Sequence, residues 1–148
     1  MGAEPFVQEY RARWVDMDFN QHMRNAAFLG CAEETRIRFL DAHDFTAGEL
    51  ARRQIGPVVL EDRLIYRREL RLLERFRVDL AIAAITADAR KMRVRNRFFL
   101  AADGTEVAAV DSFVLWFDIA ARKAITPPGD LASLWLALAR TDDFEWLS

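Results

Sequence analysis

Polar and titratable residues gather in one short stretch of the chain, where Asp16, Asp18, His22 and Asn25 precede an apolar segment. Carboxylate and imidazole groups are common general acids and bases, and a carboxylate can also act as a nucleophile. If this stretch leads into a helix, the free N–H groups and the dipole of the first turn favour developing negative charge. The stretch is therefore suited to chemistry on a carbonyl group.

The segment that follows has helical spacing. The residues on one side of a 3.6-residue helix are Ala26, Leu29, Gly30, Glu33, Ile37 and Leu40. This pattern predicts a buried helix from Asn25 to about Asp41, with Asn25 as its N-cap. Glu33 on the apolar stripe is expected to be buried, and Arg36 or Arg38 could supply the salt bridge that a buried carboxylate needs.

The same residues carry a family resemblance. The pattern D-x-D-x3-H-x2-N-x2-F, at Asp16, Asp18, His22, Asn25 and Phe28, is followed on the helix by Glu33-Glu34-Thr35-Arg36. It resembles the signature of the 4-hydroxybenzoyl-CoA thioesterase-like branch of the hotdog superfamily of acyl-CoA thioesterases. Members commonly read D-x-D-x2-G-H-V-N-N-x2-Y and then E-E-A-R, and the resemblance extends from about Phe6 to Ile125.

The resemblance implies a role for each polar residue of the stretch. Asp18 would be the nucleophile, or the general base that activates water against a thioester. The backbone N–H of Asn25, or of its neighbour in the first turn, would receive the carbonyl oxygen. His22 would transfer a proton, orient Asp18 or donate to the carbonyl. Some hotdog enzymes carry the catalytic carboxylate on the central helix, so Glu33 and Glu34 are secondary candidates.

Other interpretations of these residues stay open. Loop aspartates such as Asp18 are often turn residues, and His22 could simply bond the backbone. Gln21, Arg24 and Phe28 replace the glycine, the first asparagine and the tyrosine of the family pattern, so a protein that binds acyl-CoA without hydrolysing it is a second hypothesis. A hotdog enoyl-CoA hydratase is a weaker third, because the run from Asp18 is one residue short of its D-x-N-x2-H motif and lacks the usual proline.

Composition indicates one compact domain, residues 1–148. The chain has 148 residues, of which 52% are hydrophobic, and its net charge of -2 argues against bulk nucleic-acid binding. No window approaches the ~20 apolar residues of a membrane span, and the N-terminus lacks a secretory pattern, so we expect a cytoplasmic protein with no membrane partner. Two histidines and the single Cys31 form no recognisable metal motif, and no metal or cofactor is expected.

Basic residues are concentrated between Arg63 and Arg97, a segment that contains eleven basic and four acidic residues. Nearly all are arginines, which favour bidentate contacts to phosphate or carboxylate. One interpretation is a solvated or subunit-facing surface. The other is a docking surface for the phosphates of coenzyme A, with Arg93, Arg95 and Arg97 as substrate-binding residues.

The remaining patterns predict a sheet and two short helices. Strands are expected at 7–14, 58–66, 76–86, 90–101 and 105–119, and helices at 47–53 and 131–139, with caps at Thr46 and Asp130. In the strand at 90–101, apolar residues alternate with Arg93, Arg95 and Arg97, and Asp103-Gly104 predicts a hairpin after it. Pro127-Pro128-Gly129 is expected to end the sheet.

One long helix followed by hairpin-connected strands predicts an α+β fold. The resemblance narrows this to a hotdog fold, a curved antiparallel β-sheet wrapped around one long central helix. It also implies a homodimer or homotetramer whose active sites lie at a subunit interface, with acyl-CoA as the substrate. The aromatic residues Phe113, Trp116 and Phe117 could help to cover that interface.

Overall fold

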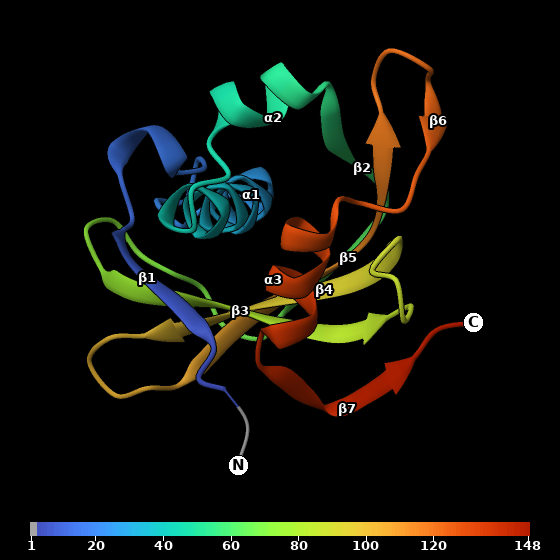
Figure 1. The fold of residues 1–148 in the computed structure, drawn as a ribbon. Coiled ribbons are helices and arrows are strands. Elements are labelled where there is room, and N and C mark those ends of the chain that lie inside the picture. The colour runs from blue at the N-terminus through green and yellow to red at the C-terminus, as the bar shows by residue number, and fades with distance from the viewer. Residues whose placement is uncertain (1–2) are drawn as a thin grey trace.

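The computed structural model describes residues 3–148 and has a curved antiparallel sheet around one long helix (Figure 1). This arrangement confirms the predicted α+β class. No helix among the described residues has the length and apolar character needed to cross a bilayer. The helices are α1 (Asn25–Ala42), α2 (Ala47–Arg53) and α3 (Gly129–Ala137), and a 3-10 turn spans Trp14–Asp16. The strands are β1 (Phe6–Arg11), β2 (Ile55–Tyr66), β3 (Arg75–Ile85), β4 (Lys91–Leu100), β5 (Glu106–Asp118), β6 (Lys123–Ala124) and β7 (Arg140–Trp146).

The sheet has the strand order β1-β3-β4-β5-β2, and all neighbours along this path are antiparallel. β6 pairs with β5, and β7 pairs with β3 in parallel. The expectation that Pro127-Pro128-Gly129 ends the sheet is therefore wrong. The chain makes only the short helix α3 after the prolines and then returns to the sheet as β7.

Alternation in β4 follows the predicted pattern. Met92, Val94, Phe98 and Leu100 are buried against α1, and the arginines at 93, 95 and 97 lie on the opposite face. The hairpin between β4 and β5 is also confirmed. Gly104 has φ 74 there, a backbone conformation that glycine adopts with little strain.

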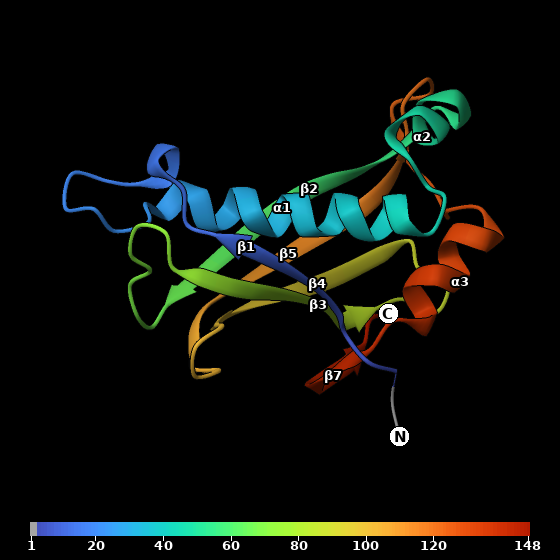
Figure 2. The same cartoon turned by 90° about the vertical axis from the view of Figure 1, so that its left-hand side faces the viewer.

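The long helix α1 crosses the concave face of the sheet (Figure 2). Its N-cap is Arg24, which makes no side-chain capping bond, so the prediction of Asn25 as the cap is wrong. Backbone bonds hold the helix entry instead: Arg24 N donates to Asp16 O at 2.9 Å, and Ala27 N donates to Arg24 O at 3.0 Å. The side chain of Asn25, the first helical residue, is thereby released from a capping role.

The core between α1 and the sheet divides into two apolar clusters. Phe28, Phe76 and Phe98 belong to the cluster beneath the N-terminal half of α1. Phe39, Trp116 and Trp135 belong to the cluster beneath its C-terminal half, where α3 lies close to the end of α1 (Figure 2). Trp116 is 0% exposed, so it cannot cover a subunit interface as we had expected.

Between the two clusters is a polar layer formed by Arg36, Asn96 and Ser112, all buried. Arg36 Nε donates to Asn96 Oδ1 at 2.9 Å, and its Nη2 donates to Ser112 Oγ at 2.7 Å. Ser112 in turn donates to a carboxylate oxygen of Asp62 on β2. Burial lowers the pKa of Arg36, and the carboxylates of Asp62, Glu33 and Asp111 partly offset that effect.

The salt bridge expected for Glu33 does not form. Glu33 is exposed, so it needs no buried partner, and Arg36 bonds Asn96 and Ser112 instead. Arg38 pairs with Glu34 at 2.6 Å. The predicted apolar stripe is wrong except at Leu40, because Ala26, Gly30, Glu33 and Ile37 are exposed and Leu29 is half-buried. The buried face of α1 is formed by Ala27, Phe28, Ala32, Thr35, Arg36, Phe39 and Leu40.

The short helices differ from the sequence expectations only at their ends. Thr46 caps α2 as predicted, accepting a hydrogen bond from Glu49 N at 3.1 Å. The N-cap of α3 is Pro128 rather than Asp130, which lies in the first turn and pairs with Arg53 at 2.9 Å. β1 ends at Arg11, because the chain turns into the 3-10 segment before Trp14 completes the predicted strand.

Candidate active site

Asp18 heads a tight loop between the 3-10 turn and α1. Its backbone N donates to His22 O at 2.7 Å, and its carboxylate Oδ1 accepts from Asn20 N at 2.8 Å and from His22 N at 3.0 Å. Gln21, which replaces the family's glycine, has φ 63 in this loop, the left-handed region that glycine adopts most easily. Asp18 is therefore a turn residue, which agrees with the structural interpretation of this aspartate.

The second carboxylate oxygen of Asp18 is not used by the loop. Among residues 3–148, Oδ2 accepts no hydrogen bond, and the side chain is exposed. One oxygen thus fixes the loop while the other stays accessible. A turn role and a chemical role for Asp18 are compatible in this geometry.

The first turn of α1 supplies backbone donors beside this loop. The leading N–H groups of a helix have no partner within the helix. In the described part of the chain, neither Asn25 N nor Ala26 N meets an acceptor, whereas Ala27 N is bonded to Arg24 O. Tyr66 at the end of β2 donates to Asn25 O at 3.4 Å and ties this turn to the sheet. Tyr66 could not be identified from the sequence pattern, because it lies 41 positions from Asn25.

His22 is joined to Asp18 through its backbone rather than through its ring. The residue is half-buried, its backbone bridges to Arg71, and its ring makes no hydrogen bond within residues 3–148. The pKa of Glu69 is lowered, first by its own backbone N–H and by Arg71, and also by the charge of His22. His22 therefore lies near Glu69, and its ring is available to a ligand.

Asp16, the other aspartate of the motif, has a structural partner. Its side chain is 10% exposed, and its two oxygens accept from Arg13 Nε and Nη2, each at 3.0 Å. The hydrogen bonds from Arg13 hold the pKa of Asp16 below its ordinary value. Both carboxylate oxygens are occupied, so Asp16 positions the segment that leads to Asp18.

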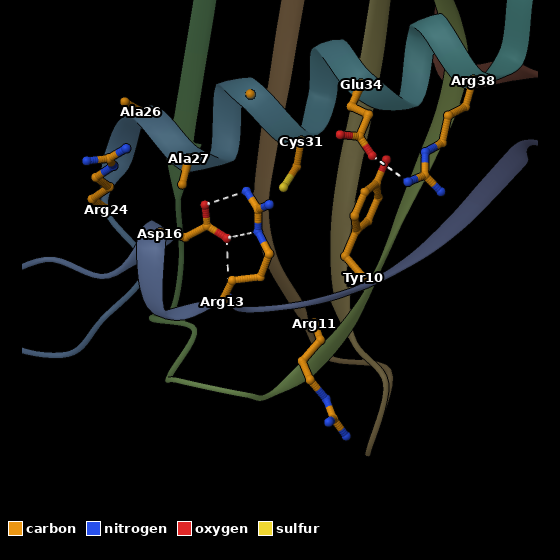
Figure 3. A pocket seen from close by; sticks show the side chains of 11 residues that line it. Tyr10, Arg11, Arg13, Asp16, Arg24, Ala26, Ala27, Cys31, Glu34 and Arg38 are labelled. Carbon is orange, nitrogen blue, oxygen red and sulfur yellow. Dashed lines mark hydrogen bonds and ion pairs between the residues drawn. The ribbon is translucent and has the colours of Figure 1, made fainter. Parts of the chain in front are cut away.

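A cavity of about 560 Å³, the α1–β1 cavity, adjoins the first turns of α1 (Figure 3). Cys31 points into it from α1, with the Arg13–Asp16 pair and the Glu34–Arg38 pair on either side. Burial raises the pKa of the Cys31 thiol to about 12, so it is protonated and a poor nucleophile. Asp18 and His22 do not line this cavity.

A second cavity of about 210 Å³, the α1–β2 cavity, lies on the other side of α1. Glu33 lines it, whereas Glu34 lines the α1–β1 cavity and is paired with Arg38. Glu33 is also separated from the start of α1 by about 12 Å along the helix axis. The two secondary candidates are therefore apart from each other and from Asp18.

The three arginines proposed for substrate binding lie on the outer face of β4, opposite α1. Arg95 pairs with Asp111 at 2.7 Å and with Asp143 at 2.8 Å, and Arg97 pairs with Asp79 at 2.8 Å. Arg93 is paired most loosely, at 3.9 Å from Glu145. Asp18, His22 and Asn25 thus lie on one loop and the helix start that follows it, with no hydrogen bond between their side chains among residues 3–148, and the arginines lie on a different surface.

No cluster of three or more metal-ligating side chains occurs among residues 3–148. What the loop and the first turn of α1 present together is a carboxylate oxygen, an imidazole ring and unengaged backbone N–H groups. This set can stabilise an oxyanion and deliver or activate a nucleophile.

Comparisons with solved structures identify the fold. A hypothetical protein from Staphylococcus aureus in complex with CoA superposes with TM-score 0.81 at 20% identity, over 93% of this chain and 88% of that one. A 1,4-dihydroxy-2-naphthoyl-CoA thioesterase from Synechocystis gives 0.81 at 15% identity, over 91% and 98%. A probable thioesterase from Escherichia coli gives 0.71 at 21% identity, over 87% and 95%. These likenesses confirm the predicted hotdog fold.

Sequence comparison identifies the family. No match was found among functionally curated proteins. The profile of the Thioesterase-like superfamily matches residues 12–134, which include the loop of Asp18, all of α1, the four long strands β2 to β5 and the short β6. The chain therefore belongs to the Thioesterase-like superfamily.

Proposed function

We propose that this protein hydrolyses an acyl-CoA, or a related acyl thioester, to the free acid and the thiol. The observation that carries the proposal is the unengaged Oδ2 of Asp18 in the loop that leads into α1, together with the unengaged amides of Asn25 and Ala26 in the first turn of that helix. The family supports a thioester substrate, and the relatives that bind CoA or act on naphthoyl-CoA support coenzyme A as the thiol.

In this mechanism the thioester carbonyl oxygen lies at the start of α1. The N–H of Asn25 or Ala26 stabilises the oxyanion, and one such donor is typically worth about 3–4 kcal/mol in the transition state. Asp18 Oδ2 either attacks the carbonyl carbon and expels the thiolate, giving an acyl-enzyme that water cleaves, or removes a proton from an attacking water. The ring of His22 orients the reactants or donates to the carbonyl.

The substitution Asp18→Asn tests this assignment. Both loop hydrogen bonds end on Oδ1, which the asparagine amide oxygen can replace, so the fold and ligand binding should persist. Turnover, measured as thiol release from a panel of acyl-CoAs, should fall at least ~10²-fold. His22→Ala should reduce turnover less if the ring only orients the reactants.

Glu33→Gln and Glu34→Gln are the matched controls, because they also neutralise carboxylates near α1. If either abolishes turnover while Asp18→Asn hydrolyses its best thioester at the wild-type rate, the catalytic carboxylate belongs to the helix. Saturable acyl-CoA binding without thiol release would favour the non-catalytic binding protein. Loss of enoyl absorbance would favour the hydratase.

A further inference from the structure

Tyr66 is the last residue of β2, and its side chain reaches the first turn of α1. Its backbone pairs with Ala108 on β5, and its ring packs edge-on against Phe28 with the ring centroids 5.4 Å apart. Phe28 is 2% exposed and belongs to the core beneath the N-terminal half of α1. The core therefore anchors the ring of Tyr66 and gives its hydroxyl group a defined position at the start of the helix.

The hydroxyl of Tyr66 donates to one particular peptide unit. Its acceptor is Asn25 O, at 3.4 Å. The planar trans peptide joins this carbonyl to the N–H of Ala26, with the oxygen and the hydrogen on opposite sides of the bond. Ala26 N is one of the two amides at the start of α1 that meet no acceptor among residues 3–148. Tyr66 thus contacts one end of a peptide whose other end is open to a ligand.

The amide of Asn25 belongs to a different peptide unit. The carbonyl of that unit, Arg24 O, accepts from Ala27 N at 3.0 Å and not from Tyr66. Asn25 O has two lone pairs, and it receives the hydroxyl of Tyr66 in addition to the bond that its place in the helical ladder provides. Of the two open amides, only that of Ala26 is therefore coupled to Tyr66.

A hydrogen bond to a peptide oxygen makes the N–H of the same peptide a stronger donor, because charge is delocalised through the unit. The effect is reciprocal. When Ala26 N–H donates to a developing oxyanion, electron density moves onto Asn25 O, which then accepts more strongly from Tyr66. A bond that is long in the free protein can shorten in this way during the reaction. Its contribution is larger in the transition state than before it, which is the condition for raising kcat.

The state of the phenol group suits this role. Burial raises the pKa of Tyr66, so its hydroxyl keeps its proton at neutral pH and remains a donor. The hydroxyl also carries no charge that would repel the oxyanion or Asp18.

We propose that Tyr66 is a positioning residue of the thioesterase reaction, which polarises the peptide between Asn25 and Ala26 so that Ala26 N–H, rather than Asn25 N–H, stabilises the oxyanion. This inference rests on the proposed function for the position of the thioester. It deepens that function by assigning the oxyanion to one of the two open amides.

Tyr66→Phe removes the hydroxyl and keeps the ring contact with Phe28. Its kcat for thiol release should fall about two- to tenfold, the size of one hydrogen bond, and its KM should change less than about twofold. Tyr10→Phe is the matched control, because Tyr10 is the other tyrosine of the chain and shares its hydrogen bond with Thr35 Oγ1, at 2.8 Å, in the middle of α1. It should keep the wild-type kcat.

Infrared spectra of a bound thioester give a measurement that a purely structural role of Tyr66 would not change. The probes are octanoyl-CoA and benzoyl-CoA with an isotopic label in the thioester carbonyl, bound to Asp18→Asn so that no turnover is required. Donation from Ala26 N–H should lower the stretching frequency of the carbonyl relative to the free thioester. Adding Tyr66→Phe should reduce this shift, and adding Tyr10→Phe should not.

Asn25→Pro separates the two amides. Proline removes the N–H of residue 25, and its fixed φ suits the first position of a helix. Arg24 already has ψ 155, the extended conformation that a residue before proline adopts. In the Asp18→Asn background the carbonyl shift should persist, because Ala26 N–H remains. Loss of the shift would assign the oxyanion to Asn25 N–H and overturn the inference.

The outcomes also separate this inference from the proposed function. Hydrolysis by Tyr66→Phe at the wild-type kcat with an unchanged carbonyl shift overturns the inference, whatever happens to stability in urea, and leaves the proposed function standing. A wild type that binds the labelled thioesters with a shift dependent on Tyr66 but releases no thiol would refute hydrolysis and support the polarising role. Failure to bind either labelled thioester would overturn both.

Discussion

At the residue scale, the two oxygens of Asp18 have separate environments. Oδ1 closes the loop through two backbone N–H groups, and Oδ2 is exposed. A carboxylate fixed by one oxygen loses little further freedom when the other reacts, which is the advantage of preorganisation. The left-handed Gln21 belongs to the same turn, so this loop is held in shape even though the family's glycine is absent.

The ion pair between Asp16 and the exposed Arg13 leads to a prediction about stability and pH. The pKa of Asp16 is lowered in the folded protein by its bonds to Arg13, so its contribution is present above the ordinary aspartate pKa near ~4. This stabilising contribution is lost as the pH falls through the pKa that Asp16 has in the folded protein. Asp16→Asn should therefore lower the free energy of unfolding at pH ~7, and the difference from the wild type should shrink towards pH ~3.

Urea unfolding at both pH values measures this effect. Asp41→Asn, a change of an exposed helix aspartate, controls for the removal of one negative charge. A constant difference between Asp16→Asn and the wild type at both pH values would contradict the ionic origin. Turnover of the folded variant should change less than in Asp18→Asn, because Asp16 has no free oxygen.

Proximity within the loop could be predicted from sequence, since Asp18, His22 and Asn25 are separated by only seven positions. The resemblance added the roles that spacing alone left open. The partners of Arg36 could not be predicted, because Asn96 and Ser112 are 60 and 76 positions away and reach it only through the sheet register. The cap at Arg24 was missed because backbone bonds, rather than its side chain, fix the helix entry.

At the element scale, β4 has an apolar face and a charged face. Its inward residues build the core beneath α1, while its outward arginines form ion pairs with β3, β5 and the β7 segment. Period-two alternation made both faces predictable. β7 was not predicted, because RTDDFEW has only two apolar residues, Phe144 and Trp146, and its place was set by the edge of β3 that it joins.

The docking of coenzyme A phosphates on this face remains a prediction, and Arg93 is its best test. Its partner Glu145 is 3.9 Å away, so charge reversal there disturbs less structure than at Arg95 or Arg97. Arg93→Glu should raise KM several-fold, and more at low salt than at high salt, because ions screen an exposed phosphate contact. Steady-state kinetics at two salt concentrations measure the KM of Arg93→Glu relative to that of the wild type.

Arg122→Glu is the control, because it reverses an exposed arginine outside the cluster. Wild-type KM for Arg93→Glu at both salt concentrations would assign this face to solvent or to another subunit.

At the scale of the whole molecule, β2 is a long edge strand. Among the described strands it pairs only with β5, and Val59, Leu60 and Tyr66 are each more than 40% exposed on it. Exposed apolar edge strands favour pairing with another chain. We therefore expect a homodimer or homotetramer, and Leu60→Lys should shift it towards the monomer, because a lysine on an edge strand opposes pairing.

Light scattering at micromolar concentration measures the assembly, with Leu73→Lys as a control at an exposed leucine away from β2. A stable wild-type monomer would count against an active site shared between subunits.

The polar layer of Arg36, Asn96 and Ser112 restricts how α1 can be exchanged between related proteins. A helix held only by apolar contacts can adjust its position along a sheet, but a guanidinium bonded to two strands cannot. A shift of one residue moves α1 by about 1.5 Å, enough to break both bonds. A chimera that receives a relative's helix must also receive that relative's residues at positions 96 and 112. A substitution at any one of these three positions therefore calls for compensating changes at the other two, although they are distant in the chain.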